Sequence, residues 1–126
     1  MVDGCAKIER FLEMIYNDEY VRIERFLEKY IDDSIKVQDC NFSIGIKDTL
    51  PEPYCEYPPL IRVGLRSSRV NKKAQEQIKD WFKNTFDLDK PELEREYSHS
   101  SKEILYEIVY KPSKELYDMI KVLSKV

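Results

Sequence analysis

Residues 50–59 read Leu-Pro-Glu-Pro-Tyr-Cys-Glu-Tyr-Pro-Pro, and this stretch decides the fold. It holds four of the six prolines of the chain. Proline fixes φ and lacks a backbone N–H, so such a stretch interrupts any helix or sheet ladder that reaches it. We therefore interpret residues 50–59 as a rigid crossover that sets how the strand-like residues 41–47 and 60–65 face each other.

On either side of this crossover, apolar residues alternate with polar ones, which is typical of strands. Farther along the chain the period becomes helical and predicts a helix over residues 72–86. Its apolar stripe consists of Ala74, Ile78, Trp81, Phe82 and Phe86. Residues 91–101 are charged and show no clear apolar face, and Pro112 with Ser113 indicates the start of a last helix.

Two segments fit both a helix and a strand. The hexapeptide Ile-Glu-Arg-Phe-Leu-Glu occurs at residues 8–13 and again at residues 23–28. The first copy lies on a helical apolar face, and Asn17-Asp18 then breaks the pattern. The second copy predicts a helix, but residues 19–25 also alternate like a strand. Residues 103–110 leave the same choice open.

Length and composition bound the class of protein. A chain of 126 residues, 42% hydrophobic and 36% charged, fits one folded domain over residues 1–126. We expect an α+β fold with an antiparallel meander sheet of three to four strands flanked by helices. The apolar runs are too short to cross a membrane. Three well-separated cysteines (Cys5, Cys40 and Cys55) indicate reduced thiols in the cytoplasm or nucleus.

The sequence offers no constellation for catalysis, metal binding or a cofactor. His99 is the single histidine and has no neighbouring cysteine or acidic cluster, as a zinc or Cys-His site would require. The three glycines do not form a phosphate-binding loop. We expect Cys55 to pack under the crossover as an inert thiol. The chain is therefore not expected to be an enzyme.

Charge is unevenly distributed and indicates two candidate partner-binding surfaces. Residues 61–84 carry seven basic and two acidic side chains, in a chain whose net charge is −3. A net-acidic chain with one basic segment disfavours nucleic acid as a partner. The acidic surface comprises Glu9, Glu13, Asp18 and Glu19, and the basic surface comprises Arg62, Arg66, Arg69, Lys72 and Lys73.

The chain resembles an RWD domain in two places. Residues 9–23 are similar to the opening helix of that family, which runs through a turn that is Ile-Tyr-Asn-Asp-Glu here, at residues 15–19. The crossover is similar to the family's proline-rich motif through Leu50, Pro51, Tyr54, Pro58 and Pro59. The resemblance covers residues 8–87, and residues 88–126 lie outside it and end in a helix. Cys55 stands where the family has a proline, and residues 87–101 form a longer link than usual.

The RWD resemblance implies a fold of the ubiquitin-conjugating type and a non-catalytic role in protein–protein interaction. Partners of such domains include translation-stress regulators, ubiquitin-pathway ligases and kinetochore assemblies. A catalytic relative would need a nucleophilic cysteine after the sheet, and no cysteine follows Leu65. The sequence leaves the oligomeric state open, and we favour a monomer over a dimer.

A second hypothesis belongs to another class of protein. The order helix, strands, helix, strands, helix also suits a small acidic secretion chaperone, which binds an extended effector segment as a homodimer. A strand at residues 103–110 and an N-terminal helix unbroken through Asp33 would favour this chaperone. A monomer in solution would favour the RWD domain instead.

Overall fold

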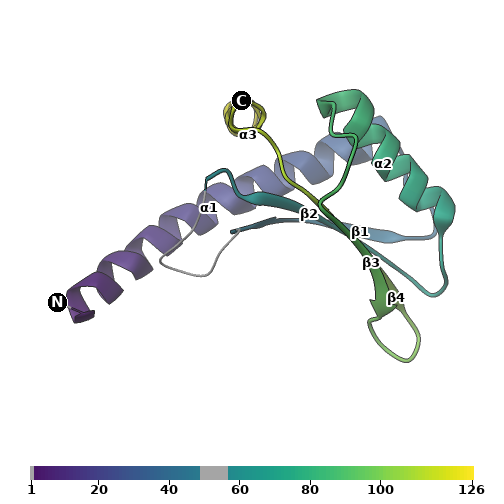
Figure 1. Cartoon of the computed structure of the whole chain (residues 1–126), viewed down its shortest axis with the longest axis horizontal. Helices are drawn as coiled ribbons and strands as arrows, with labels where there is room; N and C mark the ends of the chain where they lie inside the picture. The colour runs from purple at the N-terminus through teal and green to yellow at the C-terminus, as the bar shows by residue number, and fades with distance from the viewer. Residues whose placement is uncertain (1, 49–56) are drawn as a thin grey trace.

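The computed structural model describes the backbone of residues 2–48 and 57–126, and the side chains of residues 18–48 and 57–126. Along the chain, its elements are α1 (Val2–Ser34), β1 (Asn41–Lys47), β2 (Leu60–Ser67), α2 (Lys72–Phe86), β3 (Leu93–Ser98), β4 (Ile104–Tyr110) and α3 (Lys114–Leu123). The helices gather on one side of the sheet, and no described helix covers the other side (Figure 1). We call that uncovered side the open face.

The four strands of the described residues form one antiparallel sheet in the order β1-β2-β4-β3. The predicted α+β class, with an antiparallel sheet and flanking helices, is confirmed. The predicted meander is wrong, because α2 interrupts the run of strands and β4 lies between β2 and β3. Burial explains this order. β4 ends in the buried run Glu107–Tyr110 and takes a central place, whereas β3 is exposed throughout and takes an edge.

The proline-rich connection links two antiparallel neighbours, as its position between two strands predicts. β1 and β2 pair along the whole length of β1. The peptide bond from Tyr57 to Pro58 is cis, and Pro59 is buried directly before β2. The other residues assigned to the crossover motif (Leu50, Pro51 and Tyr54) lie outside the described residues.

The helix α1 runs unbroken through Asn17 and Asp18, so the predicted break there is wrong. Residues 19–28 are accordingly helical. An asparagine or aspartate inside a helix costs less than about 1 kcal/mol relative to alanine. Burial outweighs this cost, because Ile23, Leu27 and Ile31 are all 0% exposed in the core, and each contributes about 1.5–3 kcal/mol. No helix among the described residues is both long and apolar enough to cross a bilayer.

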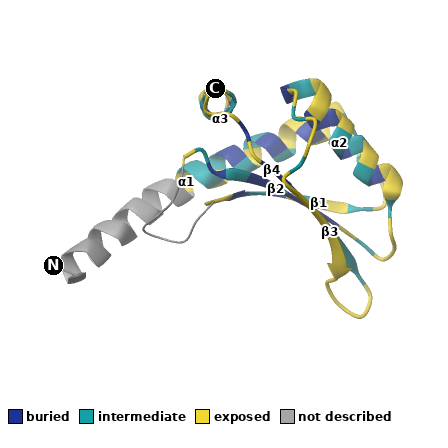
Figure 2. Ribbon diagram, viewed as in Figure 1, coloured by how far each residue is buried: buried dark blue, intermediate teal, exposed yellow. Residues whose placement is uncertain are grey.

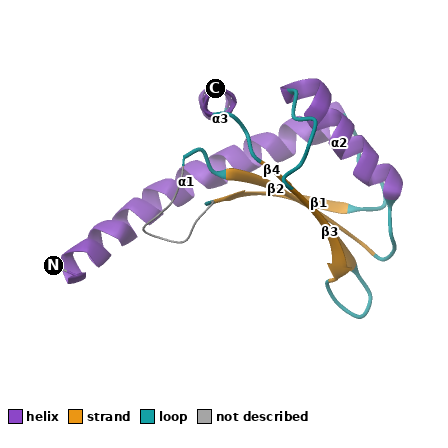
Figure 3. Cartoon of the chain, in the orientation of Figure 1, coloured by secondary structure: helices purple, strands orange, loops and turns teal. Residues whose placement is uncertain are grey.

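The helix α2 (Figure 3) spans the residues predicted for it. It buries the predicted stripe. Its first turn is capped by the Asn71 side-chain oxygen, which accepts a hydrogen bond from the N–H of Ala74 at 3.0 Å. The start of α3 is also confirmed, because the Ser113 hydroxyl accepts from the N–H of Leu116 at 3.1 Å. Local sequence therefore determines both helices.

The C-terminal half contains a β-hairpin of β3 and β4, which the sequence predicts only in part. Residues 104–110 adopt the strand alternative and form β4. The charged residues 93–98, which show no apolar face, form β3. Charged side chains suit an edge strand because they remain in water on both faces.

Candidate functional site

The β1 edge of the sheet is closed by two carboxylates of α1. The N–H of Ile44 donates to Glu28 Oε1 at 3.0 Å, and the N–H of Ile46 donates to Glu24 Oε1 at 3.1 Å. Four residues of helix advance about 6.0 Å and two residues of strand about 6.6 Å, so the two spacings match. Because these two N–H groups are already bonded, another strand cannot pair with β1 at Ile44 and Ile46.

The opposite edge, which we call the β3 edge, is the outward-facing backbone of Leu93–Ser98. Successive residues of an antiparallel strand direct their N–H and C=O groups to opposite sides. The backbone N–H groups of Ile44 and Ile46 point away from β2. The register across β2 and β4 therefore makes the backbone N–H and C=O groups of Glu94 and Glu96 point away from β4. All six residues of β3 are exposed (Figure 2). The β3 edge is therefore an open template for another strand.

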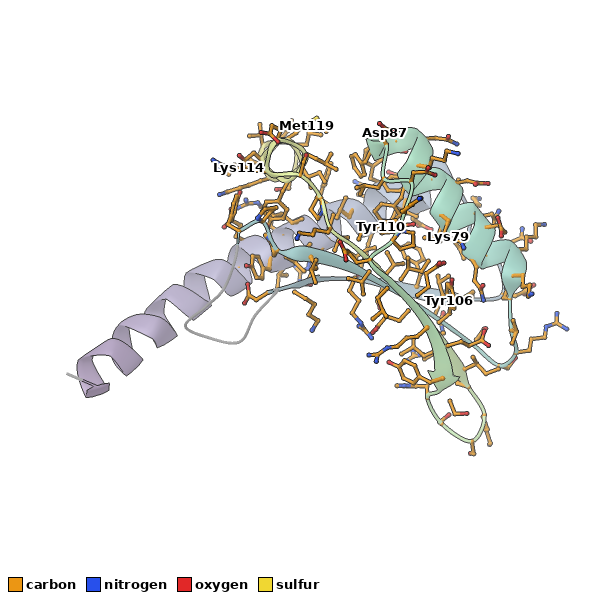
Figure 4. The ribbon with its side chains drawn as sticks, viewed as in Figure 1. Lys79, Asp87, Tyr106, Tyr110, Lys114 and Met119 are labelled. Carbon is orange, nitrogen blue, oxygen red and sulfur yellow. The ribbon has the colours of Figure 1, made fainter. Side chains whose placement is uncertain are left out.

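The side chains that β3 directs to the helix side are acidic. Lys79 Nζ of α2 lies 2.8 Å from Glu94 Oε1, and the Tyr106 hydroxyl donates to the same oxygen at 2.5 Å. Lys79 and Tyr106 are labelled in Figure 4. The hydrogen bonds from Lys79 and Tyr106 lower the pKa of Glu94. Glu96 is exposed and makes no ion pair with another described residue. One carboxylate of β3 is thus held in place, and the next faces water.

The open face beside β3 is braced by a buried carboxylate. Glu107 of β4 is 4% exposed and accepts hydrogen bonds from Nε of Arg62 on β2 and, at 2.9 Å, from Nε of Arg95 on β3. Burial opposes ionisation, but the two guanidinium groups outweigh it and hold the pKa of Glu107 below its ordinary value of 4.5. The Arg95 guanidinium also lies over the Tyr97 ring, 5.2 Å from its centroid. This network ties three neighbouring strands together next to the β3 edge.

The lowered pKa of Glu107 predicts a dependence of stability on pH. An acid whose pKa is lower in the folded state stabilises the fold above its unfolded pKa, and this stabilisation is lost as pH falls through the folded value. We expect the free energy of unfolding to fall more steeply below about pH 5 in the wild type than in Glu107→Gln. Urea denaturation of both proteins at several pH values measures the difference. Parallel curves would contradict a stabilising role for the ionised carboxylate.

The predicted basic surface does not form one continuous patch of free charge. Arg62 is bonded to Glu107, and Arg66 Nε lies 3.1 Å from a Glu103 carboxylate oxygen. Both lie on the open face. The remaining predicted residues are exposed around the start of α2, and no ion pair is described for them: Arg69, Lys72 and Lys73.

The predicted acidic surface is described only at its C-terminal end. Asp18 is exposed, whereas Glu19 lies 3.0 Å from Lys121 Nζ and therefore links α1 to α3. The side chains of Glu9 and Glu13 lie outside the described residues. The part that the structure describes thus contributes more to packing between helices than to a docking surface.

The groups that could carry chemistry are separate in the described structure. His99 lies in the loop between β3 and β4, and Cys40 is partly buried before β1. Burial raises the pKa of the Cys40 thiol, although hydrogen bonds from Ser67 and Arg66 lower it in part. A protonated thiol is a poor nucleophile. Among the described residues, no three His, Cys, Asp or Glu side chains cluster as a metal would require.

Sequence reasoning missed the residues that distinguish the two edges. Glu24 and Glu28 were treated as part of a repeat, and β3 was not recognised. The spacing of Glu24 and Glu28 by one turn and the alternation of residues 93–98 were the available signals. Searches of family models, curated proteins and solved structures find no match to this chain.

Proposed function

We propose that this chain is a non-catalytic protein-interaction domain, an adaptor that binds an extended segment of another protein as an added strand at the β3 edge. The observation that carries the proposal is the contrast between the two edges. The carboxylates of Glu24 and Glu28 block one edge, whereas the outward backbone groups of β3 have no described partner. A cytoplasmic or nuclear location accords with reduced cysteines.

Strand addition suits this edge for two physical reasons. Backbone hydrogen bonds supply affinity for an extended segment of almost any sequence, and alternate side chains supply specificity. The Glu107 network fixes the strand next to β3, so little ordering is needed when a segment binds. The exposed strand is long enough for several backbone hydrogen bonds.

Selection from a random-sequence peptide library displayed on phage tests this proposal. Peptides selected on the wild type are measured by fluorescence anisotropy against Glu96→Pro and Glu96→Ala. Proline removes the outward N–H while the inward ladder to β4 is kept, and alanine removes only the carboxylate. We expect Glu96→Pro to weaken binding by about tenfold or more, which is about 1.4 kcal/mol, and Glu96→Ala by only a few-fold.

Melting temperatures of both variants show whether the fold is kept. Equal affinity of the selected peptides for the wild type and a folded Glu96→Pro variant would contradict the proposal, because the peptides would then bind elsewhere.

Two family assignments are compatible with such a domain, and the fold supports them unequally. The RWD assignment agrees with the α+β class, but its meander is not present. The alternative, a small dimeric chaperone for an extended effector segment, is favoured by the unbroken α1 and by β4. Exposed Met119, Val122 and Leu123 on α3 offer that dimer an apolar face.

The mass in solution discriminates between these assignments. A chain of 15.1 kDa gives a monomer of that mass or a dimer of twice that mass. Light scattering after size-exclusion chromatography measures it. A concentration-independent dimer supports the chaperone, and a monomer supports the RWD domain.

A further inference from the structure

The β3 edge presents different chemistry on its two sides. Successive side chains of a strand point to opposite faces of the sheet, and an added strand places its own side chains beside them in the same alternation. Glu94 and Glu96 point to the helix side, where Glu94 meets Lys79 of α2. Leu93, Arg95 and Tyr97 point to the open face, where Arg95 meets Glu107.

The helix side of the β3 edge carries the carboxylates of Glu94 and Glu96, and Arg69 lines the same small hollow as Glu96. Lys79 contacts Glu94, and its hydrogen bond with Glu94, followed by the charges of Glu76 and Asp80, raises the pKa of that lysine. Glu96 adds a further carboxylate without an ion-pair partner among the described residues. Basic side chains of a bound segment would therefore gain attraction on this side, and acidic ones would be repelled.

The open-face side of the edge combines one apolar, one aromatic and one cationic side chain, those of Leu93, Tyr97 and Arg95. Leu93 is 43% exposed and Tyr97 is 39% exposed. Arg95 shares the single Glu107 carboxylate with Arg62, so this network keeps one net positive charge, and the Arg95 guanidinium lies over the Tyr97 ring. Apolar or aromatic side chains of a bound strand would cover this surface, as cross-strand pairs do in sheets.

A second copy of this chain is a poor occupant of the same edge. A two-fold axis through the edge pairs residues symmetrically about its centre. When the axis passes through Arg95, Arg95 lies opposite Arg95 of the second copy, and Glu94 lies opposite Glu96 of the second copy. Centred on either glutamate, it places that glutamate opposite itself. Like charges directly opposite each other destabilise a strand pair, so every central register is penalised.

Building on the proposed function, we infer that the occupant of the β3 edge is an extended segment of a different protein in which basic residues alternate with apolar or aromatic ones. The basic residues lie beside Glu94 and Glu96, and the others lie beside Leu93 and Tyr97. Alternation follows from the two chemically distinct sides of the strand, and charge complementarity fixes which side takes the basic residues.

Three synthetic peptides test this pattern. The first is Ser-Val-Lys-Tyr-Lys-Val-Ser, the second has glutamate in place of both lysines, and the third is the block isomer Ser-Lys-Lys-Tyr-Val-Val-Ser. Each is titrated into the ¹⁵N-labelled full chain, and backbone amide shifts give both affinity and location. We expect shifts at Glu94 and Glu96, and binding of the first peptide about five- to tenfold tighter than either other peptide at low salt.

Charge reversal gives the matched control. Glu96→Lys should lower the preference for the lysine peptide over the glutamate peptide about three- to tenfold, whereas Glu115→Lys, an exposed reversal on α3, should leave it unchanged. Binding at β3 without preference between the first two peptides, equal binding of the block isomer, or no binding by any of them would overturn the inference. The proposed function is tested separately. It is contradicted when library-selected peptides bind the folded Glu96→Pro variant as tightly as the wild type.

Discussion

Replacing Phe82 with alanine is expected to lower the free energy of unfolding by about 3–5 kcal/mol. Phe82 is 0% exposed and joins α2 to the centre of the sheet. Its ring stacks on Tyr110 of β4 with centroids 4.6 Å apart, and Trp81 meets it edge-on at 5.0 Å. Alanine leaves a cavity among these rings, which cannot all move to fill it.

Urea denaturation at 25 °C measures this loss. Phe82→Leu is the matched variant and should cost clearly less, because most of the volume is kept. If Phe82→Ala is unfolded without urea, the leucine variant still gives a measurable value. A loss below about 1 kcal/mol for alanine would contradict the central position of Phe82 in the core.

Removing both carboxylates that close the β1 edge should destabilise the protein and promote self-association. In Glu24→Ala/Glu28→Ala, the N–H groups of Ile44 and Ile46 lose their acceptors. Hydrogen bonds to charged acceptors are worth about 1.5–3 kcal/mol each, and partial exposure lets water replace part of that. We expect a loss of about 2 kcal/mol for the pair.

The matched variant Glu24→Gln/Glu28→Gln keeps an acceptor at each position and should recover most of that stability. Sedimentation velocity at increasing concentration should reveal association of the alanine variant alone, because its freed edge can pair with another strand. A double-alanine variant as stable and as monodisperse as the wild type would show that these carboxylates do not close the edge.

The features that the sequence predicts well are those that depend on near neighbours. The stripe from Ala74 to Phe86 repeats at the helical period within 13 residues, and its burial follows from that period. The strands around the crossover are predicted equally well, because the alternation within each strand indicates which of its side chains face the core. Caps such as Ser113 act on residues three positions away.

The features that the sequence predicts poorly are those that depend on partners far along the chain. The break at Asn17-Asp18 fails because buried residues later in α1 outweigh two weak helix formers. The roles of Glu24 and Glu28 depend on strand residues 16–22 positions away, so their one-turn spacing alone does not identify the N–H groups that they accept from. The apolar side of β3 consists of Leu93 and Tyr97 with Arg95 between them, and so short an alternation does not mark a strand until β4 pairs with it.

Amide hydrogen exchange tests the account most directly, because it measures both edges in one molecule. In the free protein, the amides of Ile44 and Ile46 should exchange slowly, and those of Glu94 and Glu96 quickly. Addition of a library-selected peptide should slow exchange at Glu94 and Glu96 while leaving Ile44 and Ile46 unchanged. Slow exchange at Glu94 and Glu96 before any peptide is added, or no change at either after saturation, would contradict an open β3 edge that binds by strand addition.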